Sequence, residues 1–317
     1  MEDYKRVELL VKVAKLYYEH GYSQDMVAKA LSLSRPYISK LLSEAKEAGI
    51  VRIEVIDPMN TGSLLEKKIM EAFQLDRVIA VPVEPGQSAL ANVGREAARY
   101  LNGIVKSGDI IGVSWGETVY HCSQAMQKRT DLEDITVVQL CGGVSNLSRN
   151  IYATEVTRNI SMALGGTSYS LPLPAVVDDG TLKKIMLQDH TISTVNELGE
   201  KANIALFTMG AFGLRSALVR AGYLTESRMK ELESQGAVGD VCSHVIDAGG
   251  QICDPSLDAR TIATPLENIR AKEHRIGVAA GLSKVDCICG ALKAGLLTAL
   301  VTTEETAGWV LERLNLS

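Results

Sequence analysis

The sequence predicts an α/β protein in two domains: an N-terminal winged helix-turn-helix domain and a Rossmann-like, doubly wound domain. Apolar residues recur at helical spacing through the first 49 residues, whereas short apolar strands alternate with helices beyond residue 62. Pro58 and Gly62 interrupt the chain between the two patterns. We therefore expect a first domain at 1–56, a linker at 57–62 and a second domain at 63–317.

The composition is that of a globular protein with an uneven distribution of charge. Of the 317 residues, 46% are hydrophobic and 22% are charged, which excludes a disordered or fibrous chain. The net charge is −5, yet residues 1–56 carry nine Lys and Arg against eight Asp and Glu. The excess of acidic residues therefore lies in the second domain, and we expect the two domains to have different tasks.

Neither the N-terminus nor the cysteines indicate secretion or metal binding. The first residues form no apolar signal segment, and Lys284, Asp286 and Lys293 interrupt the longest apolar stretch, 276–301. The six cysteines form no Cys-x-x-Cys pair. We expect a cytoplasmic protein with no membrane segment, no disulfide framework, no metal and no cofactor.

Three helices are expected in the first 49 residues. The first ends at Gly21, the second begins after a Ser23 cap, and the third begins after Ser34, with Pro36 in its first turn, and ends at Gly49. Their expected inner faces are, in order, Val7, Leu10, Val11, Ala14, Tyr17 and Tyr18; Val27, Ala30 and Leu31; and Ile38, Leu41, Leu42 and Ala45. Alternation over residues 50–55 then predicts a strand, the wing.

The second and third helices have the spacing of a helix-turn-helix, whose second helix enters the major groove of DNA. Arg35 and Lys40 lie in the first half of the third helix, where the helix dipole also favours phosphate. Tyr37 either packs on the second helix or touches DNA. The candidate DNA-binding residues are Ser23, Gln24, Ser34, Arg35, Pro36, Tyr37, Ser39, Lys40 and Ser43. The alternative is a charged three-helix domain that does not bind nucleic acid.

Strand and helix segments alternate through the second domain. The expected strands are 77–83, 109–114, 135–140, 203–209, 275–280 and 298–302, and the helices between them include 64–73, 89–105 and 304–314. Such alternation predicts a parallel sheet that is covered on both faces. Ligands of these sheets lie beyond the carboxyl ends of the strands, so the loops there are the places to search.

The segment Tyr22–Leu42, followed by Ala45–Ile53, resembles the N-terminal domain of the SorC-type sugar-binding transcriptional regulators. It is most similar to the deoxyribonucleoside regulator (DeoR) subtype, and the likeness extends to Thr306. The resemblance implies operator double-stranded DNA and a phosphorylated sugar effector as partners, and a homodimer or homotetramer. Deoxyribose phosphate or another pentose phosphate is the first expectation. The second domain would share the fold of phosphosugar isomerases and CoA transferases.

Two glycine-rich loops follow expected strands. The first opens a helix, where backbone N–H groups suit an anion, and its candidates are Gly112, Ser114, Gly116, Glu117 and Thr118. Glu117 would accept hydrogen bonds from sugar hydroxyls. The second resembles the effector loop of the family, and its candidates are Gln139, Cys141, Gly142 and Gly143. The family often carries Lys or Arg where this chain has Cys141, which leaves the identity of the effector open.

Five further effector contacts follow from the resemblance. Arg220 and Lys284 would supply cations, and Asp240 would accept hydrogen bonds from sugar hydroxyls. Asn150 and Tyr152, after the second loop, complete the set. For each of them the alternative is an exposed or ion-paired surface residue. The Cys141 thiol is expected to line the pocket and not to sense redox state.

Two functions fit these residues. The first is a DNA-binding regulator, a repressor of a sugar or deoxyribonucleoside catabolic operon, in which a phosphorylated sugar controls operator binding allosterically. The second is a phosphosugar-isomerase-like enzyme with an appended DNA-binding domain, in which Asp240 and Lys284 act as base and electrophile. None of the five His residues shares a motif with Asp or Glu. We therefore expect binding without catalysis.

Overall fold

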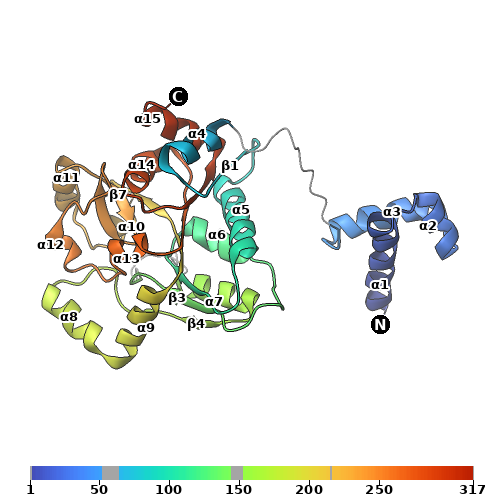
Figure 1. The fold of residues 1–317 in the computed structure, drawn as a ribbon, viewed down its shortest axis with the longest axis horizontal. Coiled ribbons are helices and arrows are strands. Elements are labelled where there is room, and N and C mark those ends of the chain that lie inside the picture. Colours follow the sequence, from blue (N-terminus) through green and yellow to red (C-terminus); the bar gives the residue numbers. More distant parts are fainter. Residues whose placement is uncertain (1, 52–63, 144–152, 215, 317) are drawn as a thin grey trace. The chain divides into compact units, whose positions relative to one another are not determined.

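The computed structural model describes residues 2–51, 64–143, 153–214 and 216–316. The chain divides into two compact units between residues 61 and 62, and both are drawn in Figure 1. The expected linker at 57–62 and most of the expected wing strand at 50–55 lie outside the described residues. Within the described ranges, no helix is both long and apolar enough to span a bilayer.

The small unit is built from helices. They are α1 (Glu2–Ala14), which continues as a π-helical turn η1 (Lys15–Glu19), then α2 (Gln24–Leu31) and α3 (Arg35–Glu47). Ser23 Oγ accepts the N–H of Met26 at 3.3 Å and so caps α2, whereas the side chain of Ser34 makes no capping bond to α3. Only Ser32, Leu33 and Ser34 separate α2 from α3, and Ser32 is left-handed with φ +54°. This is the short turn of a helix-turn-helix.

The core of the small unit confirms one expected inner face and corrects two. The face of α3 is buried as expected, at Ile38, Leu41, Leu42 and Ala45. In α1 and α2 the expected Leu10, Ala14 and Val27 are buried, and Val13 and Ala28, which were not expected, are buried with them. Val7 is 50% exposed, and Tyr18 and Ala30 are also exposed. The π-helical turn explains part of this error, because it breaks the 3.6-residue period on which the expected face depended.

A seven-stranded sheet forms the centre of the described part of the large unit. Its spatial order is β1 (Arg77–Val81), β10 (Ala299–Thr303), β9 (His274–Val278), β5 (Ile204–Phe207), β2 (Ile110–Val113), β3 (Thr136–Gln139) and β4 (Thr167–Tyr169). All of its neighbouring strands pair in parallel. The parallel sheet is therefore confirmed, although the short edge strand β4 was not expected.

Helices cover both faces of this sheet, as β5 shows. Ile204 and Leu206 enter an apolar cluster with α5 (Ala89–Ile104), α6 (Glu117–Ala125) and α7 (Ala153–Leu164). Ala205 and Phe207 enter a second cluster with α4 (Leu64–Phe73), α14 (Val285–Lys293) and α15 (Glu304–Arg313). Because side chains of a strand alternate between faces, β5 is buried on both sides.

A second, antiparallel sheet was not expected from the sequence. It consists of β6 (Met209–Ala211), β7 (Ala237–Val241) and β8 (His244–Asp247). The expected strand at 203–209 in fact ends at Phe207, and Met209 begins β6. The other described helical segments are α8 (Gly180–Gln188), α9 (His190–Lys201), α10 (Ala217–Arg220), α11 (Glu226–Ser234), α12 (Pro255–Asp258), α13 (Leu266–Arg270) and the 3₁₀ turn η2 (Leu282–Lys284).

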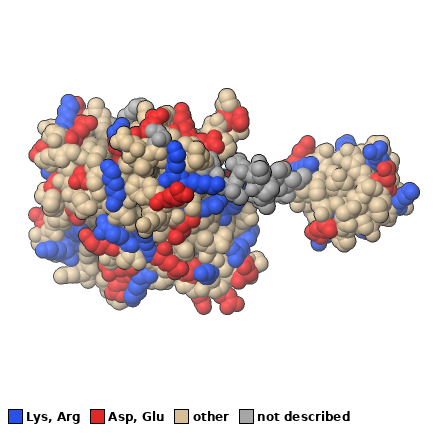
Figure 2. Space-filling model, turned by 45° about the horizontal axis from the view of Figure 1, so that its top comes forward, with Lys and Arg blue, Asp and Glu red and all other residues tan. Residues whose placement is uncertain are grey.

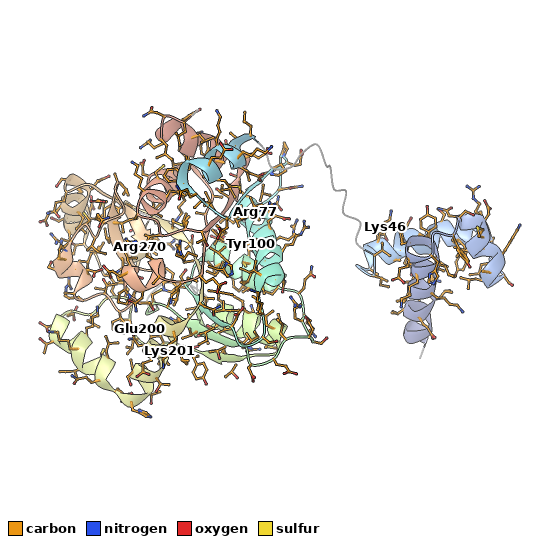
Figure 3. The ribbon with its side chains drawn as sticks, viewed as in Figure 1. Lys46, Arg77, Tyr100, Glu200, Lys201 and Arg270 are labelled. Carbon is orange, nitrogen blue, oxygen red and sulfur yellow. The ribbon has the colours of Figure 1, made fainter. Side chains whose placement is uncertain are left out.

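A buried lysine closes the end of α9. Lys272 is 4% exposed, and its Nζ donates to the carbonyl oxygens of Gly199, Glu200 and Ala202 at 2.7, 3.2 and 2.9 Å. Glu200 and Lys201, labelled in Figure 3, mark this helix end. The carbonyls left without helical partners are thus satisfied by a cation, which the helix dipole also favours. Burial lowers the pKa of Lys272 from 10.5 to about 8.

Candidate functional site

A cavity lies where the strand order of the large sheet reverses. β2 and β5 are neighbours, but β3 and β4 lie on one side of them, and β9 and β10 on the other. The loops that follow β2 and β5 therefore lead in opposite directions, and parallel sheets bind ligands at such a point. The cavity has a volume of about 580 Å³ and is lined from the loops after β2, β3 and β5, from the small sheet, and from α10 and η2.

Most of the predicted effector residues meet in this cavity. Those that line it are Ser114, Gly116, Glu117, Thr118, Cys141, Arg220, Asp240 and Lys284. They come from segments that are far apart in the sequence, so their convergence is a property of the fold. The Arg220 side chain is exposed at the end of α10, and Lys284 is partly buried at the end of η2.

The loop after β2 is held close to the loops after β3 and β5. Ser114 Oγ accepts the N–H of Thr208 at 3.3 Å, and Trp115 Nε1 donates to the carbonyl of Gly142 at 2.8 Å. Gly116 has φ +141°, and a Cβ there would lie 2.9 Å from Cγ2 of Thr208. Gly116 also precedes α6 and has no side chain with which to cap it. The N-terminus of α6 therefore borders the cavity with its partial positive charge.

Asp240 is fixed on the small sheet. A Cβ on Gly210 would lie 1.8 Å from Asp240 Oδ1, so the carboxylate packs directly on the Gly210 backbone. Asp240 Oδ2 accepts the N–H of Ser243 at 3.2 Å. Burial raises the pKa of Asp240, and the positive charge of Lys284 opposes this rise. A carboxylate whose burial disfavours its charge and a cation that favours it thus line the same cavity.

Two buried thiols form a neutral part of the wall. Cys141 and Cys242 both line the cavity. A hydrogen bond with the Cys141 thiol, together with burial, raises the pKa of Cys242 well above its ordinary value, so its thiol stays protonated at neutral pH. Residue 141 therefore contributes no positive charge to the site.

Four predicted residues have other partners and do not line the cavity. A Cβ on Gly112 would lie 2.4 Å from Cδ2 of Leu140, so Gly112 permits close packing. Gln139 Nε2 donates to the carbonyl of Cys141 at 2.6 Å, and its Oε1 accepts from Leu171 N–H at 3.2 Å. These contacts show that Gly112 and Gln139 help to set the shape of the loop.

The paired glycines of the second loop are also engaged by the protein. The N–H groups of Gly142 and Gly143 donate to the carbonyls of Ile262 and Leu173, both at 2.8 Å. A Cβ on Gly142 would lie 2.2 Å from the carbonyl oxygen of Pro174. Their N–H groups are thus engaged within the protein, and neither glycine lines the cavity. The remaining candidates, Asn150 and Tyr152, lie outside the described residues.

Several lining residues were missed. Thr208, Gly210, Cys242 and Ser243 belong to β6, β7 or the loops beside them. Their strands are only three to five residues long and show no strong alternation, so the sequence held little signal for them. Three further lining residues lie in or beside the first glycine-rich loop: Trp115, Tyr120 and His121. The position of that loop after an expected strand was a signal that could have identified them.

The small unit presents most of the predicted DNA-binding residues on its surface. Exposed residues are Ser23, Ser34, Arg35, Pro36, Ser39, Lys40 and Ser43, and Gln24 is partly buried. Arg35 Nε lies 3.6 Å from the carboxylate of Asp25, with both side chains mostly exposed. Such a pair is weak in water, so Arg35 can exchange it for another partner. In the view of Figure 2, the surface of the small unit is mostly uncharged, and basic and acidic side chains are scattered over it.

Tyr37 is partly buried against the core of the small unit, to which α2 contributes Val27 and Ala28, and it also contacts α1. Arg6 Nη1, from α1, donates to the Tyr37 hydroxyl at 2.5 Å, and its guanidinium lies 5.7 Å from the ring centroid. Arg6 also pairs with Glu44, and this hydrogen bond lowers the pKa of Glu44. Tyr37 is thus held against α1, and the negative charge of Glu44 is compensated within the small unit.

A helix-turn-helix unit joined to a doubly wound unit with a polar cavity defines a class, the ligand-binding transcriptional regulators. Residues 57–312 match the family described as "Putative sugar-binding domain". The chain belongs to this family of sugar-binding transcriptional regulators, and the resemblance to SorC-type proteins is confirmed.

Relatives cover nearly the whole chain. The deoxyribonucleoside regulator of Bacillus subtilis (strain 168) is 39% identical over 311 residues, covering 96% of this chain and 97% of that protein. The sorbitol operon regulator of Klebsiella pneumoniae is 27% identical and covers 98% of this chain and 100% of its own. The crystal structure of full-length SorC from Klebsiella pneumoniae matches with a TM-score of 0.84, covering 96% of this chain and 98% of the other. These relatives are named as regulators, which is consistent with a protein that is not an enzyme.

Proposed function

We propose that this protein is a DNA-binding repressor of a sugar or deoxyribonucleoside catabolic operon, and that a phosphorylated sugar in the cavity controls its operator binding. One observation carries the proposal: a single cavity combines the N-terminus of α6, two cationic side chains, and the carboxylates of Glu117 and Asp240. The first two suit a phosphate, and the carboxylates suit sugar hydroxyls. The relatives named as a deoxyribonucleoside regulator and a sorbitol operon regulator support a sugar-like ligand.

The anionic group is assigned to the end of the cavity at α6. Amide N–H groups at a helix N-terminus act as a partial charge of roughly +0.5. Arg220, which is exposed at the cavity, adds a full charge and a planar fork of donors that matches phosphate oxygens. Lys284 also lines the cavity, and its positive charge acts on the Asp240 carboxylate, so we assign it the second cationic contact of the ligand.

A pentose phosphate fits the remaining features. The cavity volume lies within the roughly 300–1,000 Å³ of small-molecule sites. Cys141 offers a neutral thiol where a lysine could form an imine, so the sugar would be held by hydrogen bonds and ion pairs. Deoxyribose 5-phosphate is our first candidate, and another pentose phosphate is the second.

Operator binding is assigned to α3. Arg35, Ser39 and Lys40 are exposed on the first turns of that helix, where recognition helices contact base edges. A homodimer or homotetramer would place two such helices on successive half-sites. The effector must bind the DNA-competent and the DNA-free arrangements with different affinity, because equal affinity shifts no equilibrium.

A thermal-shift screen of phosphorylated and unphosphorylated pentoses tests the effector assignment. Deoxyribose 5-phosphate or another pentose phosphate is expected to raise the Tm, and Arg220→Ala and Lys284→Ala should remove most of that increase. Lys293→Ala is the matched control, because Lys293 is an exposed cation of α14 that does not line the cavity. If an unphosphorylated sugar stabilises the protein while the phosphorylated sugars do not, the phosphate assignment is wrong.

An isomerase activity is the second candidate, because Asp240 and Lys284 line one cavity and burial raises the pKa of Asp240. A general base benefits from such a raised pKa. Incubation of the protein with the pentose phosphate that binds most tightly, followed by analysis for the isomeric sugar phosphate, separates the two functions. Catalytic turnover would contradict a purely regulatory role.

A further inference from the structure

The turn between β7 and β8 has an unusual backbone. Val241 pairs with His244, so only Cys242 and Ser243 form the loop, and their φ angles are +50° and +72°. Two-residue hairpin loops of this shape strongly favour glycine or asparagine, because a side chain is strained at positive φ. Here both positions carry side chains that line the cavity. Strain of this kind concentrates at functional sites.

Ser243 also has an unused hydroxyl. The residue is 1% exposed, and among the described residues its Oγ has no hydrogen-bond partner. Its N–H, in contrast, is donated to Asp240 Oδ2 at 3.2 Å. The backbone thus fixes Ser243, a residue that lines the cavity, beside the Asp240 carboxylate, and its buried hydroxyl is left without a partner in the described residues. A buried polar group without a partner destabilises a protein, so its presence at a cavity indicates a partner that comes with the ligand.

We propose that Ser243 Oγ and the Asp240 carboxylate together bind a hydroxyl group of the effector, at the end of the ligand opposite to its phosphate. This inference rests on the function proposed above. A sugar hydroxyl can donate to Asp240 and accept from Ser243 at the same time, which satisfies both groups. A phosphate in the same place would meet the Asp240 carboxylate, and like charges repel. Glu117, the first residue of α6, also lines the cavity, but the N–H groups of this helix terminus offer the phosphate donors that the turn lacks. We therefore place the phosphate at α6, and the turn discriminates sugars by the position of a free hydroxyl.

The assignment predicts opposite effects on stability and on binding. Ser243→Ala removes a buried hydroxyl without a partner, so the Tm of the ligand-free protein should equal or exceed that of the wild type. The same change should weaken the binding of a pentose phosphate by roughly 3- to 10-fold, the value of one hydrogen bond. Ser243→Gly also removes the hydroxyl and relieves the strained φ, so it provides a second variant that is expected to fold.

Thr302 provides a matched control. Its Oγ1 is fully buried and, within the described ranges, has no hydrogen-bond partner, but Thr302 does not line the cavity. Thr302→Val should therefore leave ligand affinity unchanged. Both Ser243 variants and this control are titrated calorimetrically with deoxyribose 5-phosphate, ribose 5-phosphate and inorganic phosphate.

The expected result is weaker binding of the pentose phosphates to both Ser243 variants, with inorganic phosphate bound as in the wild type. Wild-type affinity of both variants for the pentose phosphates would overturn the role of Ser243 and leave the proposed function intact. An equal loss of inorganic phosphate binding would overturn the orientation of the ligand. If the wild-type protein binds neither pentose phosphate, the proposed function fails, and this inference fails with it.

Discussion

Replacement of Gly210 by alanine tests how the carboxylate of the cavity is held. The new Cβ would lie 1.8 Å from Asp240 Oδ1 and 2.6 Å from its Cγ. Since Cβ contacts under 3.0 Å are essentially never seen, the oxygen must withdraw by at least 3.0 − 1.8, or 1.2 Å. Because Oδ2 belongs to the same rigid carboxylate group, we expect this movement to disturb its 3.2 Å hydrogen bond from Ser243 N–H. Gly210→Ala therefore displaces the carboxylate from its position at the cavity wall.

Two measurements report this displacement. Overpacking of this kind costs about 1–3 kcal/mol, so the Tm of Gly210→Ala should fall by several degrees. A hydrogen bond to a charged group contributes about 1.5–3 kcal/mol, so calorimetric titration should show roughly 10- to 100-fold weaker binding of the pentose phosphate.

Gly308→Ala is the control, because nothing lies within 4 Å of a Cβ there and Gly308 is inside α15. It should stabilise the protein by about 0.5–1 kcal/mol without changing ligand affinity. Wild-type affinity in Gly210→Ala would refute the contact between Asp240 and the ligand.

The remaining predictions concern α3 and Lys272. The double variant Arg35→Ala, Lys40→Ala should bind operator DNA more weakly at moderate salt, by about 1–3 kcal/mol for each lost base contact. Its affinity for pentose phosphate should be unchanged. Unaltered operator affinity in a gel-shift titration would exclude α3 as the recognition helix. Burial lowers the pKa of Lys272 to about 8, so between that value and 10.5 the unfolded chain binds a proton that the folded chain does not. The free energy of unfolding of the wild type should therefore rise relative to that of Lys272→Met by on the order of 3 kcal/mol between pH 8 and pH 10.5. Urea denaturation measures this difference, and an equal difference between the two proteins at both pH values would contradict the lowered pKa of Lys272.

Local periodicity predicted those helices and strands whose apolar pattern is complete within their own segment of sequence. The expected strands at 77–83 and 298–302 pair as β1 and β10, and the expected helix at 64–73 coincides with α4. The inner face of α3 was also predicted, because Ile38, Leu41 and Leu42 follow the helical period without interruption. In these segments burial and propensity favour the same structure.

The small sheet and the details of the cavity could not be predicted in the same way. β6 contains only three residues and follows β5 after Thr208, so the two strands appeared as one in the sequence. Gly142 was proposed as a ligand contact because its loop resembles the effector loop of the family, and the structure adds that the carbonyl of Pro174 leaves no room for a side chain there. His244 contacts Asp258 at 2.5 Å, a pair 14 residues apart that no local motif indicated. These features depend on tertiary contacts, and a single sequence carries no direct record of them.

The central claim is that a phosphorylated sugar in the cavity of the large unit controls DNA binding by the small unit. A double-stranded site is first selected from random DNA on the full-length protein, and its Kd is then measured by fluorescence anisotropy with and without saturating pentose phosphate. We predict that the ligand weakens DNA binding by roughly 10-fold or more, a coupling within the usual range of about 1–3 kcal/mol, and that Arg220→Ala loses this response while it still binds the DNA. An operator Kd that stays the same at saturating pentose phosphate would contradict the account.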